Sequence, residues 1–130
     1  MSRKISAPVR NPETATFWDA AANGSLLLKT CRSCKEPHFY PRTICPFCNS
    51  DDTEWLTSSG RGTIYSWSVM RRAPNPYAIA FVTLAEGPTI MSNIVECDFD
   101  ALRIGQEVEL IFVPAEDGAA VPMFRPLAHA

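Results

Sequence analysis

Four of the five cysteines of this chain stand in two Cys-x-x-Cys pairs that lie close together in the sequence. The pairs are Cys31 with Cys34 and Cys45 with Cys48, and residues 35–44 separate them. A Cys-x-x-Cys turn places two thiolates on one side of a tight knuckle, and two facing knuckles supply the tetrahedral sulfur set that zinc prefers. The spacing therefore predicts a structural site for one zinc per chain, with these four cysteines as ligands.

Other roles for the four thiols fit the sequence less well. Four thiolates also hold iron, so iron stays open as the alternative ion. Two disulfides are disfavoured because no apolar secretory segment follows the basic N-terminal residues, so a reducing cytoplasm is the expected setting. A redox-active pair would need a helix N-terminus after a strand, which the turn residues around these pairs disfavour. Four cysteines close the coordination shell, so we expect a structural rather than a catalytic ion.

The fifth cysteine, Cys97, lies alone and far along the chain. A nucleophilic cysteine would want a histidine partner, and the two histidines are His38, inside the cysteine segment, and His129 near the C-terminus. We expect Cys97 to be a small buried apolar residue. Since no phosphate-loop glycine motif, Ser-His-Asp set or pair of catalytic carboxylates appears either, the sequence predicts a chain that is not itself an enzyme.

Length and composition bound the fold and the class of partner. The 130 residues suit one compact domain or two very small ones, and the 46% hydrophobic and 20% charged fractions are those of a globular protein. No apolar run approaches the roughly 18 residues of a membrane span, so we expect a cytoplasmic protein without a membrane partner. The net charge of -2 provides no general attraction for nucleic acid.

A helix and a strand are expected to lead into the first cysteine pair. Asn11 is suited to the N-cap and Gly24 to termination of the helix, and residues 25–31 then form a strand. The apolar stripe of this helix contains Phe17 and Trp18. The stripe packs either on this chain or on a partner protein, and the sequence leaves both possibilities open.

After the cysteines, residues from 63 onward alternate with period two, which is typical of β-strands. Turn signals separate four strands, TIYSWSVMRR, AIAFVTLA, TIMSNIVE and EVELIFVP, with a short helical insertion, DFDALRIG, between the third and the fourth. VPMFRPL is expected to close the barrel as a fifth strand, which its prolines limit to an edge. This order favours a small Greek-key barrel of the OB type, although a small sandwich would give similar strings.

The predicted fold is therefore mostly β. Residues 1–25 form an N-terminal helical arm, residues 26–59 a rubredoxin-like zinc ribbon, and residues 60–130 an OB-fold domain.

The order of these motifs resembles one known family over roughly residues 17–126. The similar segments are the FW helix, the strand ending in Cys-x-x-Cys, FYPRTICPFC, GRGTIYSW, the Pro-rich hairpin, EGPTIMSNI, LRIGQEVEL and the terminal FRP. They resemble the acyl-CoA-associated family of rubredoxin-like zinc ribbons with an OB-fold, formerly a domain of unknown function. The resemblance implies an accessory subunit that pairs with thiolase-like enzymes, with hydroxymethylglutaryl-CoA synthases, or with acyl-CoA aldolases and hydratases, and that helps to receive coenzyme A.

Coenzyme A combines a flat adenine with several phosphates, so its receptor needs an aromatic surface beside guanidinium groups. Trp67, Arg71 and Arg72 offer both within a short span, and we expect them to bind CoA. For Phe17 and Trp18 we expect contact with the catalytic partner. The sequence also allows Trp67 to be barrel core and the two arginines to be a solvated hairpin tip or an anchor for an acidic partner.

The alternative function is a single-stranded nucleic-acid binder, because zinc ribbons and OB barrels both serve in that role. The net negative charge and the presence of only 12 basic residues favour the acyl-CoA accessory subunit instead.

Overall fold

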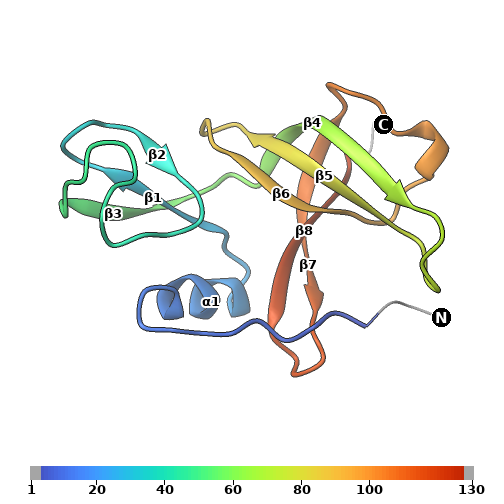
Figure 1. Ribbon diagram of the computed structural model, residues 1–130, viewed down its shortest axis with the longest axis horizontal. Helices are drawn as coiled ribbons and strands as arrows, with labels where there is room; N and C mark the ends of the chain where they lie inside the picture. The colour runs from blue at the N-terminus through green and yellow to red at the C-terminus, as the bar shows by residue number, and fades with distance from the viewer. Residues whose placement is uncertain (1–3, 128–130) are drawn as a thin grey trace.

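The computed structural model describes residues 4–127, which form a small three-stranded ribbon and a closed β-barrel with one helix beside them (Figure 1). His129 lies outside the described residues. In chain order the elements are α1 (Ala15–Ala22), β1 (Leu27–Cys31), β2 (Pro37–His38), β3 (Thr53–Thr57), β4 (Arg61–Met70), β5 (Tyr77–Leu84), β6 (Thr89–Ile94), the 3-10 helix η1 (Phe99–Ala101), β7 (Glu107–Pro114) and β8 (Ala120–Pro126). No helix within residues 4–127 is long and apolar enough to span a membrane.

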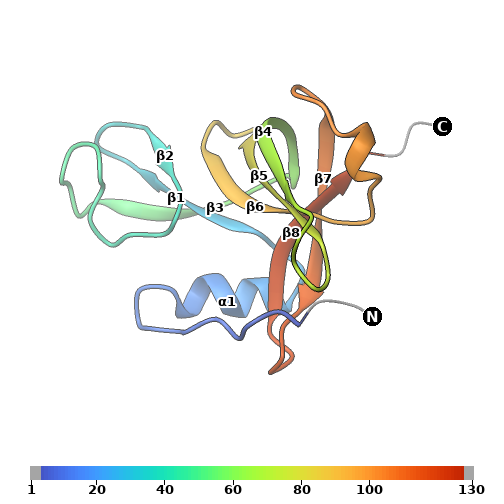
Figure 2. The same ribbon diagram turned by 45° about the vertical axis from the view of Figure 1, so that its right-hand side comes forward.

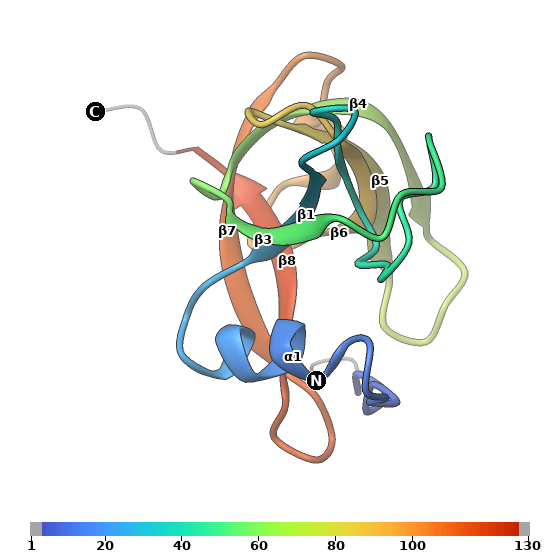
Figure 3. The same ribbon diagram turned by 90° about the vertical axis from the view of Figure 1, so that its left-hand side faces the viewer.

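The ribbon is an antiparallel sheet in the order β2-β1-β3, and Figure 3 views it from the end opposite the barrel. In β1, Lys29 pairs with His38 on one side and with Trp55 on the other. Cys31 pairs with Thr53 at the last position of the register between β1 and β3. The central strand therefore delivers Cys31 to the end of the sheet, where the first cysteine pair begins.

The barrel closes in the order β4-β5-β6-β8-β7, and β4 pairs with β7 to complete the ring. Neighbouring strands are antiparallel except β6 and β8, which are parallel. The small helix η1 lies between β6 and β7 in the chain, as predicted. This arrangement confirms the mostly β fold, with a ribbon followed by an OB-like barrel.

The prediction that prolines limit the last strand to an edge is wrong, because β8 lies between β6 and β7. Its pairing with β6 is confined to Ile94 opposite Phe124. The carbonyl of Pro122 points toward β6 and accepts a hydrogen bond from Ser92 Oγ at 3.0 Å. The backbone N and C=O of one strand residue point to the same side of the strand. The N–H that proline lacks would therefore face β6, where pairing is sparse, so Pro122 removes no hydrogen bond between β7 and β8.

A β-bulge in β4 makes the predicted period-two alternation wrong beyond Ile64. Ile64 pairs with Val82 and Ser66 pairs with Phe81, which leaves Tyr65 as the extra residue. Ile64 is buried, whereas Tyr65 is 67% exposed. One inserted residue reverses the side of the sheet that every later residue faces. Tyr65 and Trp67, which the alternation placed on one face of β4, therefore do not share a face.

The helix begins later than predicted. Thr14 occupies the N-cap position and Ala15 begins α1, so the assignment of Asn11 as N-cap is wrong. Asn11 instead closes the preceding turn, since its Oδ1 accepts from the backbone N–H of Thr14 at 3.0 Å and its carbonyl accepts from that of Ala15 at 2.8 Å. Gly24 ends the helix as predicted, with a left-handed φ of 86° and an N–H that donates to the Ala21 carbonyl.

One hydrophobic core is common to the helix, the ribbon and the barrel. Figures 1 and 2 both show α1 below the ribbon and beside β8. Phe17 of α1 and Leu28 of β1 belong to the same buried cluster as Val82 and Phe124 of the barrel. The domain boundaries at residues 25 and 59 stay a prediction, and they divide a core that the three parts have in common.

The polar segment between β3 and β4 is anchored by the carboxylate of Glu86. Ser58 Oγ donates to Glu86 Oε1 at 2.7 Å, and the backbone N–H of Ser59 donates to Oε2 at 2.8 Å. Burial raises the pKa of Glu86, but these donors outweigh it and leave the pKa below its ordinary value. The connection from ribbon to barrel is therefore held in place rather than loose.

Candidate metal centre and barrel surface

The structure brings the four predicted ligand cysteines together. Cys31 Sγ lies 3.6 Å from Cys48 Sγ, and Cys34 Sγ lies 3.7 Å from Cys45 Sγ. All four sulfurs lie within 4.8 Å of one another. A tetrahedral zinc with Zn–S bonds of about 2.3 Å requires sulfurs about 3.8 Å apart, so the four positions fit a single four-coordinate ion.

The two knuckles repeat one backbone geometry. The N–H of Lys35 donates to the Cys31 carbonyl and that of Asn49 to the Cys45 carbonyl, both at 2.9 Å. Lys35 and Asn49 follow the second cysteine of their pairs and have left-handed φ values of 67° and 63°. Asn tolerates this conformation well and Lys less so, which indicates that the knuckle geometry determines the backbone at Lys35.

Backbone N–H groups point at the sulfurs and favour their ionised form. Cys34 N–H donates to Cys31 Sγ at 3.5 Å, and this bond is the main cause that lowers the pKa of Cys31 to about 7. The N–H of Glu36 lowers the pKa of Cys34, but burial and the adjacent thiols outweigh it and raise that pKa to about 12. Neighbouring sulfurs thus oppose a second ionisation, which a bound divalent cation relieves.

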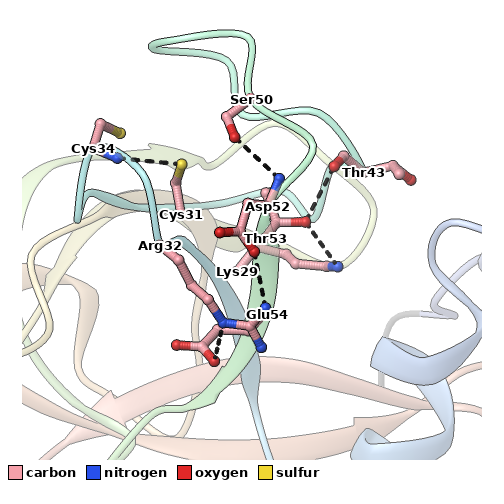
Figure 4. A network of polar contacts seen from close by, with 9 residues as sticks. All are labelled: Lys29, Cys31, Arg32, Cys34, Thr43, Ser50, Asp52, Thr53 and Glu54. Carbon is pink, nitrogen blue, oxygen red and sulfur yellow. Dashed lines mark hydrogen bonds and ion pairs between the residues drawn. The ribbon is translucent and has the colours of Figure 1, made fainter.

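Side chains next to the cysteines join the two knuckles to the ribbon sheet (Figure 4). The Arg32 guanidinium lies 2.9 Å from Asp52 Oδ1 and 3.0 Å from Glu54 Oε2. Thr53 Oγ1 donates to the Thr43 carbonyl at 3.1 Å, which ties β3 to the loop before the second knuckle. The ion pairs are about half exposed, so their contribution is to position the knuckles rather than to stabilise them strongly.

Glu13 makes a contact with the loop between the cysteine pairs that the sequence did not indicate. Its Oε2 accepts from the backbone N–H of Thr43 at 2.7 Å, which holds its pKa below the ordinary value, and Arg42 lies 3.6 Å from its Oε1. The segment before α1 thereby contacts the loop between the cysteine pairs. An acidic residue near a helix start is usually interpreted as a dipole contact, which is why the sequence gives no signal for this link.

The remaining thiol and the described histidine lie in different parts of the fold. Cys97 follows β6, is half-buried against the core, and has a pKa raised by burial and by Asp98. His38 in β2 is 3% exposed, and burial lowers its pKa. Neither of its ring nitrogens has a hydrogen-bond partner within residues 4–127. A raised thiol pKa and a histidine on a separate sheet do not support a nucleophile and base pair.

The residues expected to bind CoA lie on β4 and on the β4–β5 hairpin, where the register places Trp67 opposite the buried Ala80. Trp67 is 36% exposed and is not part of the core cluster. Arg71 and Arg72 line a cavity at the tip of the β4–β5 hairpin, and Arg71 Nη2 lies 2.7 Å from Asp100 Oδ1 of η1. Within residues 4–127, Arg72 makes no ion pair. Of the two hairpin arginines, Arg72 is thus the one whose guanidinium is not held by a carboxylate.

The residues expected to contact a partner differ in exposure. Phe17 is 1% exposed and packs edge-on against Trp18, Phe39 and Tyr40 at ring-centroid distances of 4.9, 5.7 and 5.4 Å. Trp18 is half-buried, and its Nε1 donates to Tyr40 Oη at 3.1 Å. These contacts favour packing on this chain for Phe17 and leave part of Trp18 at the surface.

Comparison with known proteins agrees with this architecture. The family model described as the ChsH2 rubredoxin-like zinc ribbon domain matches residues 18–54, and the ChsH2 C-terminal OB-fold domain matches residues 55–113. A solved chain titled "Ltp2-ChsH2(DUF35) aldolase" superposes with a TM-score of 0.82 at 32% identity, covering 92% of this chain and 98% of that chain. The chain belongs to the ChsH2-type DUF35 family.

Curated relatives of this DUF35 chain are named for several different roles. A DUF35 domain-containing scaffold protein of Methanothermobacter thermautotrophicus is 40% identical over 63% of this chain and 67% of the relative. A probable enoyl-CoA hydratase alpha subunit of Thermomonospora curvata is 32% identical over 92% of this chain but only 39% of the relative. The benzoylsuccinyl-CoA thiolase subunit BbsA of Geobacter metallireducens is 31% identical over 65% of this chain and 59% of the relative. The family is thus associated with hydratase, thiolase and aldolase proteins, and this chain spans less than half of the hydratase subunit.

Proposed function

We propose that this DUF35 chain is a non-catalytic accessory subunit that scaffolds a thiolase-type enzyme, or a related aldolase, hydratase or synthase, acting on acyl-CoA. The observation that carries the proposal is the likeness to the DUF35 chain of the aldolase complex over 98% of that chain's length. The scaffold role by which the Methanothermobacter relative is named supports it. So does the separation of Cys97 from His38, because together they lack the geometry of a catalytic pair.

Zinc is the ion that we propose for the four cysteines. A closed four-sulfur shell leaves no position for water or substrate, so the ion holds the ribbon together and takes no part in chemistry. The sulfur positions fit iron as well, since tetrahedral sulfur sites accept either ion. Elemental analysis of the purified chain distinguishes the two.

We further propose that Trp67 and Arg72 contact coenzyme A. A partly exposed indole offers a face for the adenine, and an unpaired guanidinium farther along the same hairpin offers charge-assisted hydrogen bonds to a phosphate. Arg71 is held by Asp100, so we assign it to the shape of the hairpin as much as to the ligand. The nucleic-acid alternative needs a cationic track along the barrel, and strands β4, β5 and β6 together carry one cation, Arg61.

The scaffold function predicts co-purification with a catalytic subunit. When the chain is co-expressed with a thiolase-like protein from the same organism, we expect one gel-filtration peak that contains both proteins. We expect the catalytic subunit alone to lose at least tenfold in activity, because its active form includes the accessory chain. Two separate peaks with unchanged activity would show that the chain is not a scaffold for that enzyme.

The CoA assignment predicts a specific arginine dependence. Arg72→Ala is expected to weaken CoA binding at least tenfold, since a charge-assisted hydrogen bond contributes about 1.5–3 kcal/mol. Isothermal titration of CoA into the complex and into the chain alone measures the effect. Arg103→Ala is the matched control, because Arg103 is equally exposed but lies on the turn after η1. Equal CoA affinity in the two variants would remove Arg72 from the site.

A further inference from the structure

Exposed large apolar residues of the described chain gather on three neighbouring barrel strands. Phe81 of β5 is 46% exposed and Met91 of β6 is 66% exposed. Tyr65 and Met70 on β4 are exposed as well. An apolar group of this kind on the surface of a soluble protein marks an interaction site more often than chance exposure does. We call the surface formed by Ser66, Ser68, Ile79, Phe81 and Met91 the β4–β6 face.

The β4–β6 face contains a shallow cavity of about 120 Å³. The strand register places Phe81 directly opposite both Ser66 on β4 and Met91 on β6, so their side chains are nearest neighbours. Pockets for small molecules usually measure about 300–1,000 Å³. The cavity is too small for a nucleotide and is of the size that accepts one protruding side chain.

The charges around this face define what it can accept. Residues of β4, β5 and β6 include no carboxylate. The single cation of these strands is Arg61 at the start of β4, and the unpaired Arg72 follows the end of the same strand. Aromatic residues and Met at the centre, with charge confined to the edge, are typical of a protein–protein interface core. Arg61 complements acidic groups at the rim of the partner, while Arg72 at the other end is the guanidinium that we assign to a CoA phosphate.

We infer that the β4–β6 face docks the catalytic subunit, which inserts one apolar side chain into the cavity and places carboxylates near Arg61. This inference rests on the proposed function and adds the surface and the partner chemistry. The hairpin that carries Arg72 borders the face, so a subunit seated there lies next to the proposed CoA contacts. A CoA site built from both proteins follows from this arrangement.

Charge substitutions at Met91 test the inference. Met91→Glu is expected to weaken binding to the co-expressed thiolase-like subunit at least tenfold, because it places a carboxylate among apolar contacts and opposite an acidic rim. Met91→Lys breaks the same apolar contact but suits an acidic rim, so we expect a smaller loss. Ile104→Glu is the control, since Ile104 is 73% exposed and lies on the turn before β7. Affinity is measured by titration, with melting temperature and metal content recorded for each variant.

The outcomes separate this inference from the proposed function. If the unmodified chain fails to bind the subunit, both are wrong. If the unmodified chain and Met91→Glu bind equally, the docking face is wrong and the scaffold function stands. A Met91→Glu variant that binds the subunit normally but changes from dimer to monomer would assign the face to a second copy and overturn the inference. Phe81→Thr, which deletes the aromatic ring but keeps a good strand residue, provides a second variant should Met91→Glu melt early.

Discussion

Replacing Cys45 with serine is expected to abolish metal binding and to unfold the ribbon. Cys45 is fully buried, and its sulfur lies 3.7 Å from that of Cys34, so a hydroxyl there supplies neither the charge nor the bond length of a thiolate. The knuckles and β2 have little else to hold them, since β2 spans only Pro37–His38. A structural zinc contributes about 10–16 kcal/mol of binding free energy in zinc-finger peptides, more than this sheet can replace.

Elemental analysis and hydrogen exchange measure the result. We expect about one ion per unmodified chain and less than a tenth of that in the variant, with loss of amide protection confined first to β1, β2 and β3. Cys97→Ser is the matched control, because it makes the same thiol-to-hydroxyl change outside the metal centre. That variant is expected to keep its ion and to lose about 1 kcal/mol or less. A Cys45→Ser variant with full metal content and unchanged melting would refute the metal centre.

The metal centre could be predicted from the sequence because its determinants are local. Each Cys-x-x-Cys pair and the left-handed residue after it form one tight turn, so spacing alone indicates the geometry at Lys35 and Asn49. The succession of barrel strands along the chain was predictable for the same reason, because turns and period-two segments are local signals.

Long-range contacts and register were not predictable. The bulge at Tyr65 inserts one residue into a strand whose alternation is otherwise regular. No residue type at this position indicates a bulge. The contacts of Glu13 with Thr43 and of Glu86 with Ser58 join segments about 30 residues apart, which become neighbours only after the fold forms. Likewise, an apolar stripe on a helix indicates that this face is buried. It does not indicate whether the face packs against the same chain or against another protein.

Phe17→Ala decides between these two possibilities and is expected to destabilise the whole chain by about 3–5 kcal/mol. The ring is 1% exposed and packs among three aromatic rings of α1 and the loop after β2. Its cluster also contains Leu28 of the ribbon and Phe124 of the barrel, so the cavity left by alanine adjoins both parts. Against a typical total stability of about 5–15 kcal/mol, thermal unfolding should shift down by about 10 °C or more.

The position of the cavity also determines how the chain unfolds. Because one core joins α1, the ribbon and the barrel, Phe17→Ala should lower a single cooperative transition that is seen alike by circular dichroism and by aromatic fluorescence. Val9→Ala is the control, since Val9 is 87% exposed and its truncation should change stability by less than about 0.5 kcal/mol. If α1 were instead an arm that docks on the catalytic subunit, Phe17→Ala would leave the melting temperature unchanged and weaken only the binding to that subunit. The aromatic contacts of Phe17 within this chain predict the opposite result, a large loss of stability that precedes any loss of binding.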